Sequence, residues 1–305
     1  MSKKKIQFIQ SELANRKFVF LPATEIRLLI QSYCKFSNED ENQFQEFWNH
    51  AVPQKDETEE EVYPYKGTLV SYFTMDVKKD FCNINRSFSH NLQNDVHGRS
   101  IEFIDPTTAG TESKFRIHKQ WPEAANSNPI LQGMLRILFE ILSLPSLIKW
   151  TAAPGTDHSS SIYEPMMSAF RVTKSNSSDI HMLKYENGEP GPEGVHQDLC
   201  ELTVILLVSR KNITKGSAGN RIWSLDQASG KPNKKDLGSK KLLAELVLRD
   251  RFDTLFLLDR EAKHEALPLI IEEIYNNGQR ENVAVRDVLT FEVRRSRIDK
   301  QQNKI

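Results

Sequence analysis

The residues best suited to carry chemistry stand at the end of the segment 190–198. This segment ends in His196-Gln197-Asp198 and leads directly into the apolar run 202–209. Side chains two positions apart on a β-strand point to the same face, so we expect His196 and Asp198 to converge on one point. An imidazole and a carboxylate are two of the three ligands in the facial triad that binds non-haem Fe(II). A His-X-Asp pattern alone arises by chance in many proteins.

A third ligand should be a histidine much further along the chain, on a strand that returns beside the first. His264 fits this description, because it follows the apolar run 254–258, which is typical of a buried strand. The remaining histidines have poorer contexts, since most precede the strand-rich half of the chain and one precedes the His-X-Asp pattern on a strand of its own. These are His50, His90, His97, His118, His158 and His181.

A co-substrate with a carboxylate tail needs a fixed cation, and arginine offers two parallel hydrogen bonds to a carboxylate. Arg286 opens the apolar stretch 287–291 and is the first candidate for this cation. Arg294 and Arg295 are competitors. An ordinary surface salt bridge is the alternative for all three.

Three blocks of sequence, taken together, resemble one known family. They are residues 192–198, residues 253–260 leading to His264, and residues 286–289, and residues 212–217 resemble the segment that follows the first ligand strand. The chain is similar over roughly residues 180–294 to the bacterial 2-oxoglutarate–Fe(II) dioxygenases that include the free L-isoleucine hydroxylases. The resemblance implies an α+β protein with a double-stranded β-helix (jelly-roll, cupin-like) core and flanking helices.

The resemblance also implies a reaction. Fe(II) would bind His196, Asp198 and His264, and Arg286 would anchor the distal carboxylate of 2-oxoglutarate. O2 would convert 2-oxoglutarate to succinate and CO2 while a small substrate, a free L-amino acid or a close derivative, is hydroxylated. Metal and co-substrate perform the difficult chemistry, and the protein supplies position and a dry pocket.

The chain departs from the family pattern near the region where a substrate would be recognised. Leu199-Cys200-Glu201 follows the Asp, where the family usually has a glycine or another small residue. Segments 224–245 and 271–285 look longer than usual, and could form either a lid or a platform. If the strand pattern continues, Cys200 lies on the same face as His196 and Asp198; otherwise it is a small buried apolar residue.

Other functions remain open at this point. The same chemistry could act on a peptide or protein, and a zinc or manganese hydrolase could use the same ligands with a general base beside the metal. A jelly-roll binding module without catalysis is a further alternative.

Composition excludes several classes of protein. Lys plus Arg and Asp plus Glu are 41 each, so no basic surplus favours nucleic acid. We expect no signal peptide and no membrane span, and three cysteines are too few for a disulfide framework. A cytoplasmic protein is expected, with no membrane partner.

The expected elements divide the chain into two parts: a mixed, mostly helical part over residues 1–120 and the β-helix core over residues 121–305. In the first part we expect a strand at 18–21, a helix over 23–36 capped by Thr24, and core packing of Phe44, Phe47 and Trp48. Asn128-Pro129 begins the clearest helix, which Pro145 ends. Short β-rich runs follow, typical of a sandwich or jelly roll. They are 169–172, 180–185, 202–209, 254–258 and 288–293, with 242–248 ambiguous between helix and strand.

Overall fold

The computed structural model describes most of the chain with several gaps. The described residues are 2–56, 61–73, 75–77, 99–103, 114–117, 119–143, 161–175, 188, 190, 194–272, 274–276, 279–281 and 283–295. The strand expected at 180–185 lies outside this part, as do His90, His97, His118, His158 and His181.

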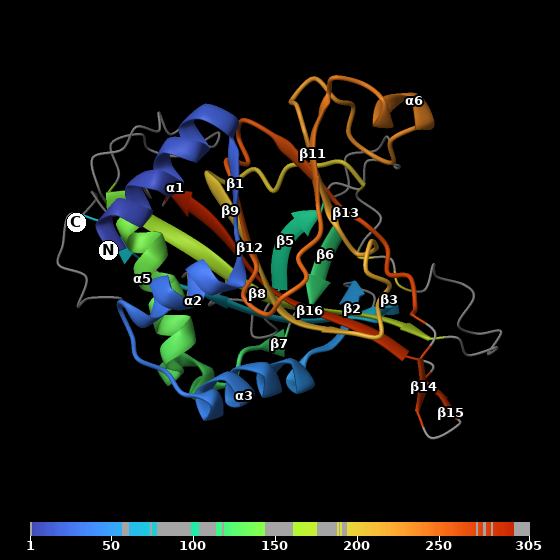
Figure 1. Ribbon diagram of the computed structural model, residues 1–305, viewed down its shortest axis with the longest axis horizontal. Helices are drawn as coiled ribbons and strands as arrows, with labels where there is room; N and C mark the ends of the chain where they lie inside the picture. Colours follow the sequence, from blue (N-terminus) through green and yellow to red (C-terminus); the bar gives the residue numbers. More distant parts are fainter. Residues whose placement is uncertain are drawn as a thin grey trace, which may run out of the picture.

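The largest element is an 11-stranded sheet with the order β1-β12-β9-β16-β8-β3-β2-β6-β5 (Figure 1). Its centre is antiparallel, with β16 paired to β8 on one side and to β9 on the other. The bounds of the strands on this path are β1 Phe18–Leu21, β12 Thr254–Leu257, β9 Leu202–Lys211, β16 Val283–Arg295, β8 Ile162–Ser175, β3 Glu61–Tyr72, β2 Val52–Asp56, β6 Lys114–Ile117 and β5 Arg99–Phe103. Two short strands join from the side, β4 Met75–Asp76 on β8 and β7 Lys119–Gln120 on β3.

A second, smaller sheet faces the centre of the large one. It has the order β11 (Leu242–Leu246), β10 (Asn220–Trp223) and β13 (Lys263–Ala266). An apolar cluster joins the two sheets, because Ile222 of β10 belongs to the same buried group as Leu207 of β9 and Leu255 of β12. From β8 onward the strands divide between the two facing sheets, with β8, β9, β12 and β16 in the large sheet and β10, β11 and β13 in the small one, as in a double-stranded β-helix. The predicted α+β jelly-roll fold is confirmed.

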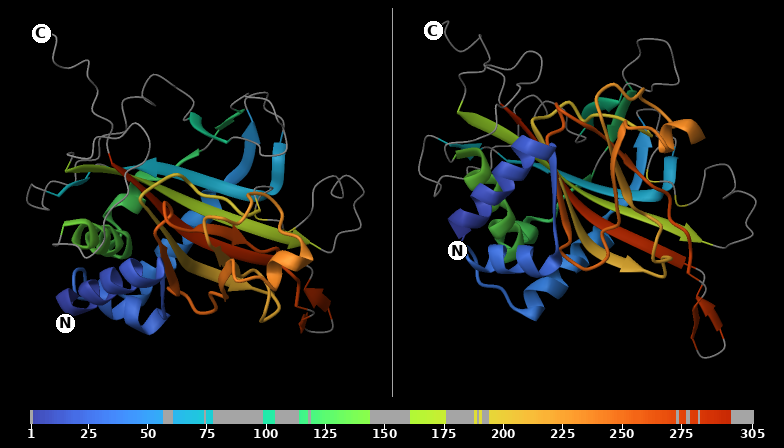
Figure 2. Two further views of the ribbon diagram at one scale, coloured as in Figure 1. Left: turned by 90° about the horizontal axis from the view of Figure 1, so that it is seen from above. Right: turned by 45° about the horizontal axis from the view of Figure 1, so that its top comes forward.

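Helices cover the opposite face of the large sheet (Figures 1 and 2). They are α1 Ser2–Arg16, α2 Ala23–Gln31, α3 Asn38–Glu46 and α5 Pro129–Ser143, with the 3-10 turns η1 Phe47–His50 and η3 Glu123–Ser127. Alternate residues of β9 therefore enter different cores: Val204 and Leu206 pack with the helices, whereas Ile205 packs with the small sheet. Burial on both faces explains why this strand is a continuous apolar run. None of the helices in the described part of the chain is long and apolar enough to cross a membrane.

The local predictions for the helices are confirmed in part. Asn128 caps α5 as expected, with its Oδ1 accepting a hydrogen bond from the N–H of Ile130 at 3.0 Å. The helix expected over 23–36 ends earlier, at Gln31, and its cap position is Pro22 rather than Thr24. In the ambiguous run 242–248, residues 242–246 form a strand, β11, which pairs with β10.

The two apparently long segments form different structures. Residues 224–245 include the short helix α6 (Lys234–Leu237) and most of β11. Within the described part of 271–285, β14 (Ile274–Asn276) and β15 (Gln279–Glu281) form a hairpin that projects from the body (Figure 1).

Strands from both predicted parts of the chain share the large sheet. β1 lies beside β12, with Phe18 opposite Leu257, and β3 lies beside β8, with Leu69 opposite Ala169. The division at residue 120 stays a prediction.

Candidate metal and co-substrate site

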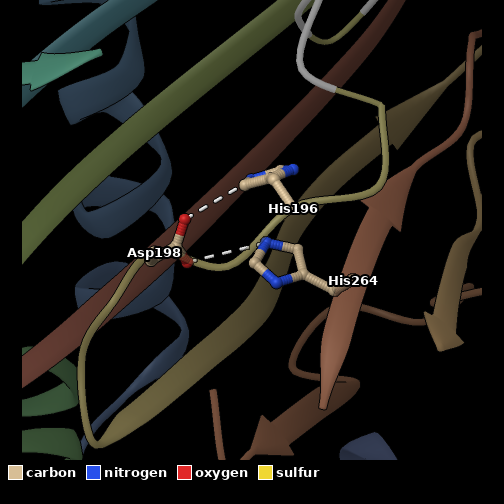
Figure 3. A group of neighbouring side chains, drawn as sticks. All are labelled: His196, Asp198 and His264. Atoms are coloured by element: carbon tan, nitrogen blue, oxygen red, sulfur yellow. Dashed lines mark ion pairs between the residues drawn. The ribbon is translucent and has the colours of Figure 1, made fainter. Parts of the chain in front are cut away.

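His196, Asp198 and His264 meet at the edge of the small sheet (Figure 3). The backbones of the two histidines are directly paired, since each N–H donates to the other's carbonyl at 2.9 Å. Asp198 reaches both rings: its Oδ1 lies 3.4 Å from His196 Nε2, and its Oδ2 lies 3.6 Å from His264 Nε2. One ligand atom from each residue lies within 4.8 Å of the others. Donors on one face of an octahedron with bonds of about 2.1 Å are about 3 Å apart, so these residues fit a metal ion.

The reason for this convergence differs from the predicted one. His196 forms an isolated bridge, and Asp198 lies outside any strand. The chain bends immediately afterwards, because Leu199 has a φ of 58°, in the left-handed region. The expectation that Asp198 and His196 share one face of a continuous strand is therefore wrong. The bend lies after Asp198 and redirects the chain before Cys200.

The same bend decides the position of Cys200. Its side chain is fully buried, and its Sγ lies 3.2 Å from the hydroxyl of Thr203. Cys200 thus leaves the alternation that would have placed it beside His196, and it packs behind Asp198. Burial, then the carboxylates of Asp259 and Asp198, raise the pKa of the Cys200 thiol.

Asp198 is held in its ionised form. Burial opposes ionisation, but the two imidazoles outweigh it and hold the pKa of Asp198 well below its usual range. The hydroxyl of Thr203 acts in the same direction and donates to Asp198 Oδ2 at 3.1 Å. An ionised carboxylate is the state that a divalent cation requires.

Arg286 lies on β16, on the face that looks toward the small sheet. Val288, two residues further along, belongs to the apolar cluster between the sheets, and Arg286 shares its face. The Arg286 side chain is buried, and its Nε and Nη2 atoms have no hydrogen-bond partner among the described residues. Burial, followed by the charge of Arg210 directly opposite on β9, lowers the pKa of Arg286 to about 10. A buried guanidinium without an anion fits a carboxylate ligand.

The two competing arginines have other contacts. Arg294 Nη2 donates to the backbone carbonyl of Asp198 at 2.9 Å and to Glu292 at 3.1 Å. Arg295 Nε donates to the hydroxyl of Tyr163 at 3.1 Å. Both guanidinium groups thus donate to groups around the site. In Arg286, by contrast, two buried donor atoms, Nε and Nη2, have no partner among the described residues.

A surface depression of about 520 Å³ lies elsewhere. Arg221, one of its lining residues, alternates on β10 with Ile222, which faces the inner cluster. The depression is therefore on the outer face of the small sheet. Its lining includes none of the four residues predicted for the site.

Three residues around the site were not singled out from the sequence: Thr203, Arg210 and Asp259. A signal existed for Asp259, since a carboxylate directly after a strand of buried apolar residues requires compensating donors. No comparable signal marked Thr203 or Arg210, because their contacts depend on the bend after Asp198 and on the register between β9 and β16.

A family model for the 2OG-Fe dioxygenases matches residues 109–292, more than half of the chain. The chain belongs to the 2OG-Fe dioxygenase family. This dioxygenase is therefore an oxidoreductase that uses Fe(II), 2-oxoglutarate and O2. A search of curated proteins found no match.

Several solved structures share the fold of this dioxygenase. An Fe(II)/α-ketoglutarate-dependent dioxygenase named TqaL matches with a TM-score of 0.68 and 18% identity, covering 98% of this chain and 90% of that one. A bsmA homologue from Methylobium petroleophilum PM1 matches with a TM-score of 0.63 and 14% identity, over 97% and 94% of the two chains. IDO from Bacillus thuringiensis matches with a TM-score of 0.58 and 12% identity, over 95% and 99%. At these identities the likeness concerns the fold alone.

Proposed function

We propose that His196, Asp198 and His264 hold the Fe(II) of this dioxygenase and that Arg286 anchors 2-oxoglutarate. The observation that carries the proposal is the convergence of the three ligand atoms within 4.8 Å, inside a fold whose family uses this metal. The unpaired, buried guanidinium of Arg286 supports the second half. The anchored co-substrate would extend from Arg286 along the inner face of the large sheet toward the metal ligands.

Each protein group has a separate task in this proposal. Bound iron supplies the activation of O2, so that 2-oxoglutarate, O2 and a substrate C–H group become succinate, CO2 and a hydroxylated product. Arg286 compensates the distal carboxylate through parallel hydrogen bonds and sets the direction of the chelating end. Asp198 stays ionised through its neighbours. The apolar residues between the sheets, among them Leu207 and Val288, exclude water from the reacting groups.

For the substrate we propose a free L-amino acid or a close derivative, hydroxylated on carbon. The support is the resemblance of the three sequence blocks to the family that includes the free L-isoleucine hydroxylases, two of which carry His196 and Arg286. The even balance of charges agrees with a small substrate, because a nucleic-acid substrate favours a basic groove.

Product analysis tests the substrate class. The purified protein is loaded with Fe(II) and incubated with 2-oxoglutarate, ascorbate and a panel of free amino acids, and products are examined for the mass gain of one oxygen. We expect at least one amino acid to gain oxygen and to accelerate succinate formation. Oxygen incorporated only into peptides or proteins would contradict the amino-acid proposal. A product formed equally under argon would indicate a hydrolase instead.

Single alanine variants test the metal ligands. His196→Ala, Asp198→Ala and His264→Ala should each abolish Fe(II)-dependent succinate formation, while far-UV circular dichroism remains that of the folded protein. His50→Ala is the matched control, because His50 lies at the end of η1, outside the ligand cluster. Normal turnover by His264→Ala would remove the third ligand from the proposal.

A further inference from the structure

One buried carboxylate, that of Asp259, contacts both segments that carry the metal ligands. Asp259 lies two residues after the end of β12 and is fully buried. Its Oδ1 accepts a hydrogen bond from the backbone N–H of Asp198 at 3.0 Å, and its Oδ2 accepts one from the N–H of Cys200 at 3.3 Å. These two N–H groups flank Leu199, the residue with positive φ at the bend. The carboxylate therefore holds Asp198 and the bend that follows it.

The same carboxylate faces the ring of His264 from behind. Asp259 Oδ1 lies 3.5 Å from His264 Nδ1, at the long limit of a hydrogen bond. His264 Nδ1 is buried, and no hydrogen bond to it is formed by any described residue. The opposite ring nitrogen, Nε2, is the one that faces Asp198 Oδ2. A proton on Nδ1 directed at Asp259 leaves the Nε2 lone pair for a metal.

The backbone of Asp259 adds a further contact with the ligand segment. Its carbonyl accepts a hydrogen bond from the side-chain amide of Gln197, the residue between His196 and Asp198. Asp259 thus accepts hydrogen bonds from three residues of the ligand segment: Gln197, Asp198 and Cys200. Burying an ionised carboxylate is costly unless several donors compensate it, and here the donors come from the segments that hold the ligands.

We propose that Asp259 is a positioning residue of the metal site, which sets the spacing between Asp198 and His264 and fixes the tautomer of His264. This inference rests on the proposed role of His196, Asp198 and His264 as metal ligands. Asp259 does not touch the metal in this arrangement. It acts on Asp198 through the bend at Leu199 and on His264 through the imidazole ring. Loss of the Asp259 carboxylate should therefore weaken metal binding more than it lowers the stability of the fold.

Asp253 offers a matched control on the same strand. It precedes β12 as Asp259 follows it, it is 4% exposed, and its carboxylate accepts backbone hydrogen bonds from Ala23, Arg249 and Asp250. Both residues are buried carboxylates that hold a turn together, but the described contacts of Asp253 include no metal ligand. A purely structural role predicts the same phenotype for Asp253→Asn and Asp259→Asn.

The experiment compares Co(II) binding by the wild type, Asp259→Asn and Asp253→Asn, with Co(II) as a spectroscopic substitute for Fe(II). An asparagine keeps one acceptor oxygen and presents an NH2 group to one of its three donors. We expect Asp259→Asn to bind Co(II) about 10- to 100-fold more weakly, with a changed visible absorption spectrum. Asp253→Asn should unfold more easily and keep the wild-type affinity and spectrum. Unchanged binding by Asp259→Asn, or equal losses in both variants, would overturn the inference.

A second measurement uses the wild type alone, in case Asp259→Asn does not fold. In protein with 15N-labelled histidine, Zn(II) should shift the resonances of two imidazoles, and each should carry its proton on Nδ1. For His196 the Nδ1 partner is the carbonyl of Gly194 at 2.8 Å, and for His264 it is Asp259. A metal-shifted His264 resonance without a proton on Nδ1 would contradict the role of Asp259. Failure of the wild type to bind Co(II) or Zn(II) would instead contradict the proposed metal ligands.

Discussion

At the scale of single residues, environment separates side chains that look equivalent in the sequence. Arg286, Arg294 and Arg295 all lie on β16, yet they differ in what they contact. Arg294 and Arg295 donate to Asp198 and Tyr163, whereas Arg286 has buried donors without a partner in the described structure. An unpaired buried cation is costly in the free protein, and an anionic ligand removes that cost. The contacts therefore favour Arg286 as the anchor.

This difference predicts the effect of removing Arg286. Arg286→Ala should raise the KM for 2-oxoglutarate tenfold or more, since losing a buried charge-paired contact costs about 2–5 kcal/mol and about 1.4 kcal/mol is tenfold in affinity. Arg286→Lys should restore part of the affinity, because lysine keeps the charge without the two-pronged geometry. Steady-state succinate formation against 2-oxoglutarate concentration measures both. Arg295→Ala is the control. A larger increase in the KM for 2-oxoglutarate in Arg295→Ala than in Arg286→Ala would show that Arg286 is not the anchor.

The carboxylate of Asp198 leads us to predict hydroxylation and not halogenation. Neighbouring groups hold the pKa of the Asp198 carboxyl well below its usual range, and in the proposed site this carboxylate would fill the coordination position that a halide could otherwise take. We expect the wild type to form a hydroxylated product and no chlorinated product in buffer containing chloride. Mass spectrometry with chloride and bromide buffers distinguishes the two products by isotope pattern. A halogenated product from the wild type would show that Asp198 does not stay on the metal.

At the scale of elements, the segment that carries His196 is held by a close backbone contact. Val195 and Gly230 exchange hydrogen bonds, with Val195 N–H donating to Gly230 O at 2.8 Å and Gly230 N–H donating to Val195 O at 2.9 Å. Gly194 has a φ of 61°, and a Cβ placed there would lie 2.5 Å from the Gly230 carbonyl. Gly230, in the long segment 224–245, is thus fixed by backbone hydrogen bonds beside Val195, the residue before His196. This contact favours a permanent wall beside the site over a mobile lid.

Gly194→Ala tests that contact. The added methyl group meets backbone and forces a left-handed conformation, so we expect a loss of about 1–3 kcal/mol in the free energy of unfolding. Metal affinity should also fall, because His196 follows two residues later. Gly216→Ala is the control, since a Cβ there meets nothing within 4 Å. Urea unfolding and Co(II) titration measure the two effects, and equal stability of both variants would contradict the close approach.

At the scale of the whole molecule, the two sheets and the helical layer have different structural roles. The helices bury one face of the large sheet, and the small sheet carries His264 and is bridged to His196 (Figures 1 and 3). In the proposed arrangement, metal and co-substrate would connect the two sheets, with three ligands on the side of the small sheet and Arg286 on the large one. Ligands that bind only the folded state stabilise it.

Thermal unfolding measures how much metal and co-substrate stabilise the folded protein. Mn(II), which substitutes for Fe(II) without turnover, should raise the Tm, and 2-oxoglutarate should raise it further. A ligand at a hundredfold excess over its Kd contributes about 2.7 kcal/mol. In Arg286→Ala the increment from Mn(II) should persist, and that from 2-oxoglutarate should shrink. If 2-oxoglutarate raises the Tm of Arg286→Ala as much as that of the wild type, Arg286 is not the anchor.

Sequence alone predicted several of the elements and the candidate metal ligands of this protein. Apolar runs such as 202–209 and 254–258 are strands because a buried strand is apolar on both faces, and β9 and β12 match them closely. His196, Asp198 and His264 were recognisable because metal chemistry restricts the choice of side chains, and the resemblance of three separated blocks made their order informative. These properties are local, so they can be read without knowing which segments meet.

Only the tertiary structure decided how those residues meet. The backbone bends at Leu199 and does not continue as a strand, and this bend places Cys200 behind Asp198. Register between β9 and β16 places Arg210 opposite Arg286. Asp259 joins both ligand segments through contacts that span about sixty positions of the chain. Such contacts depend on the packing of distant segments, which no local pattern of residues encodes.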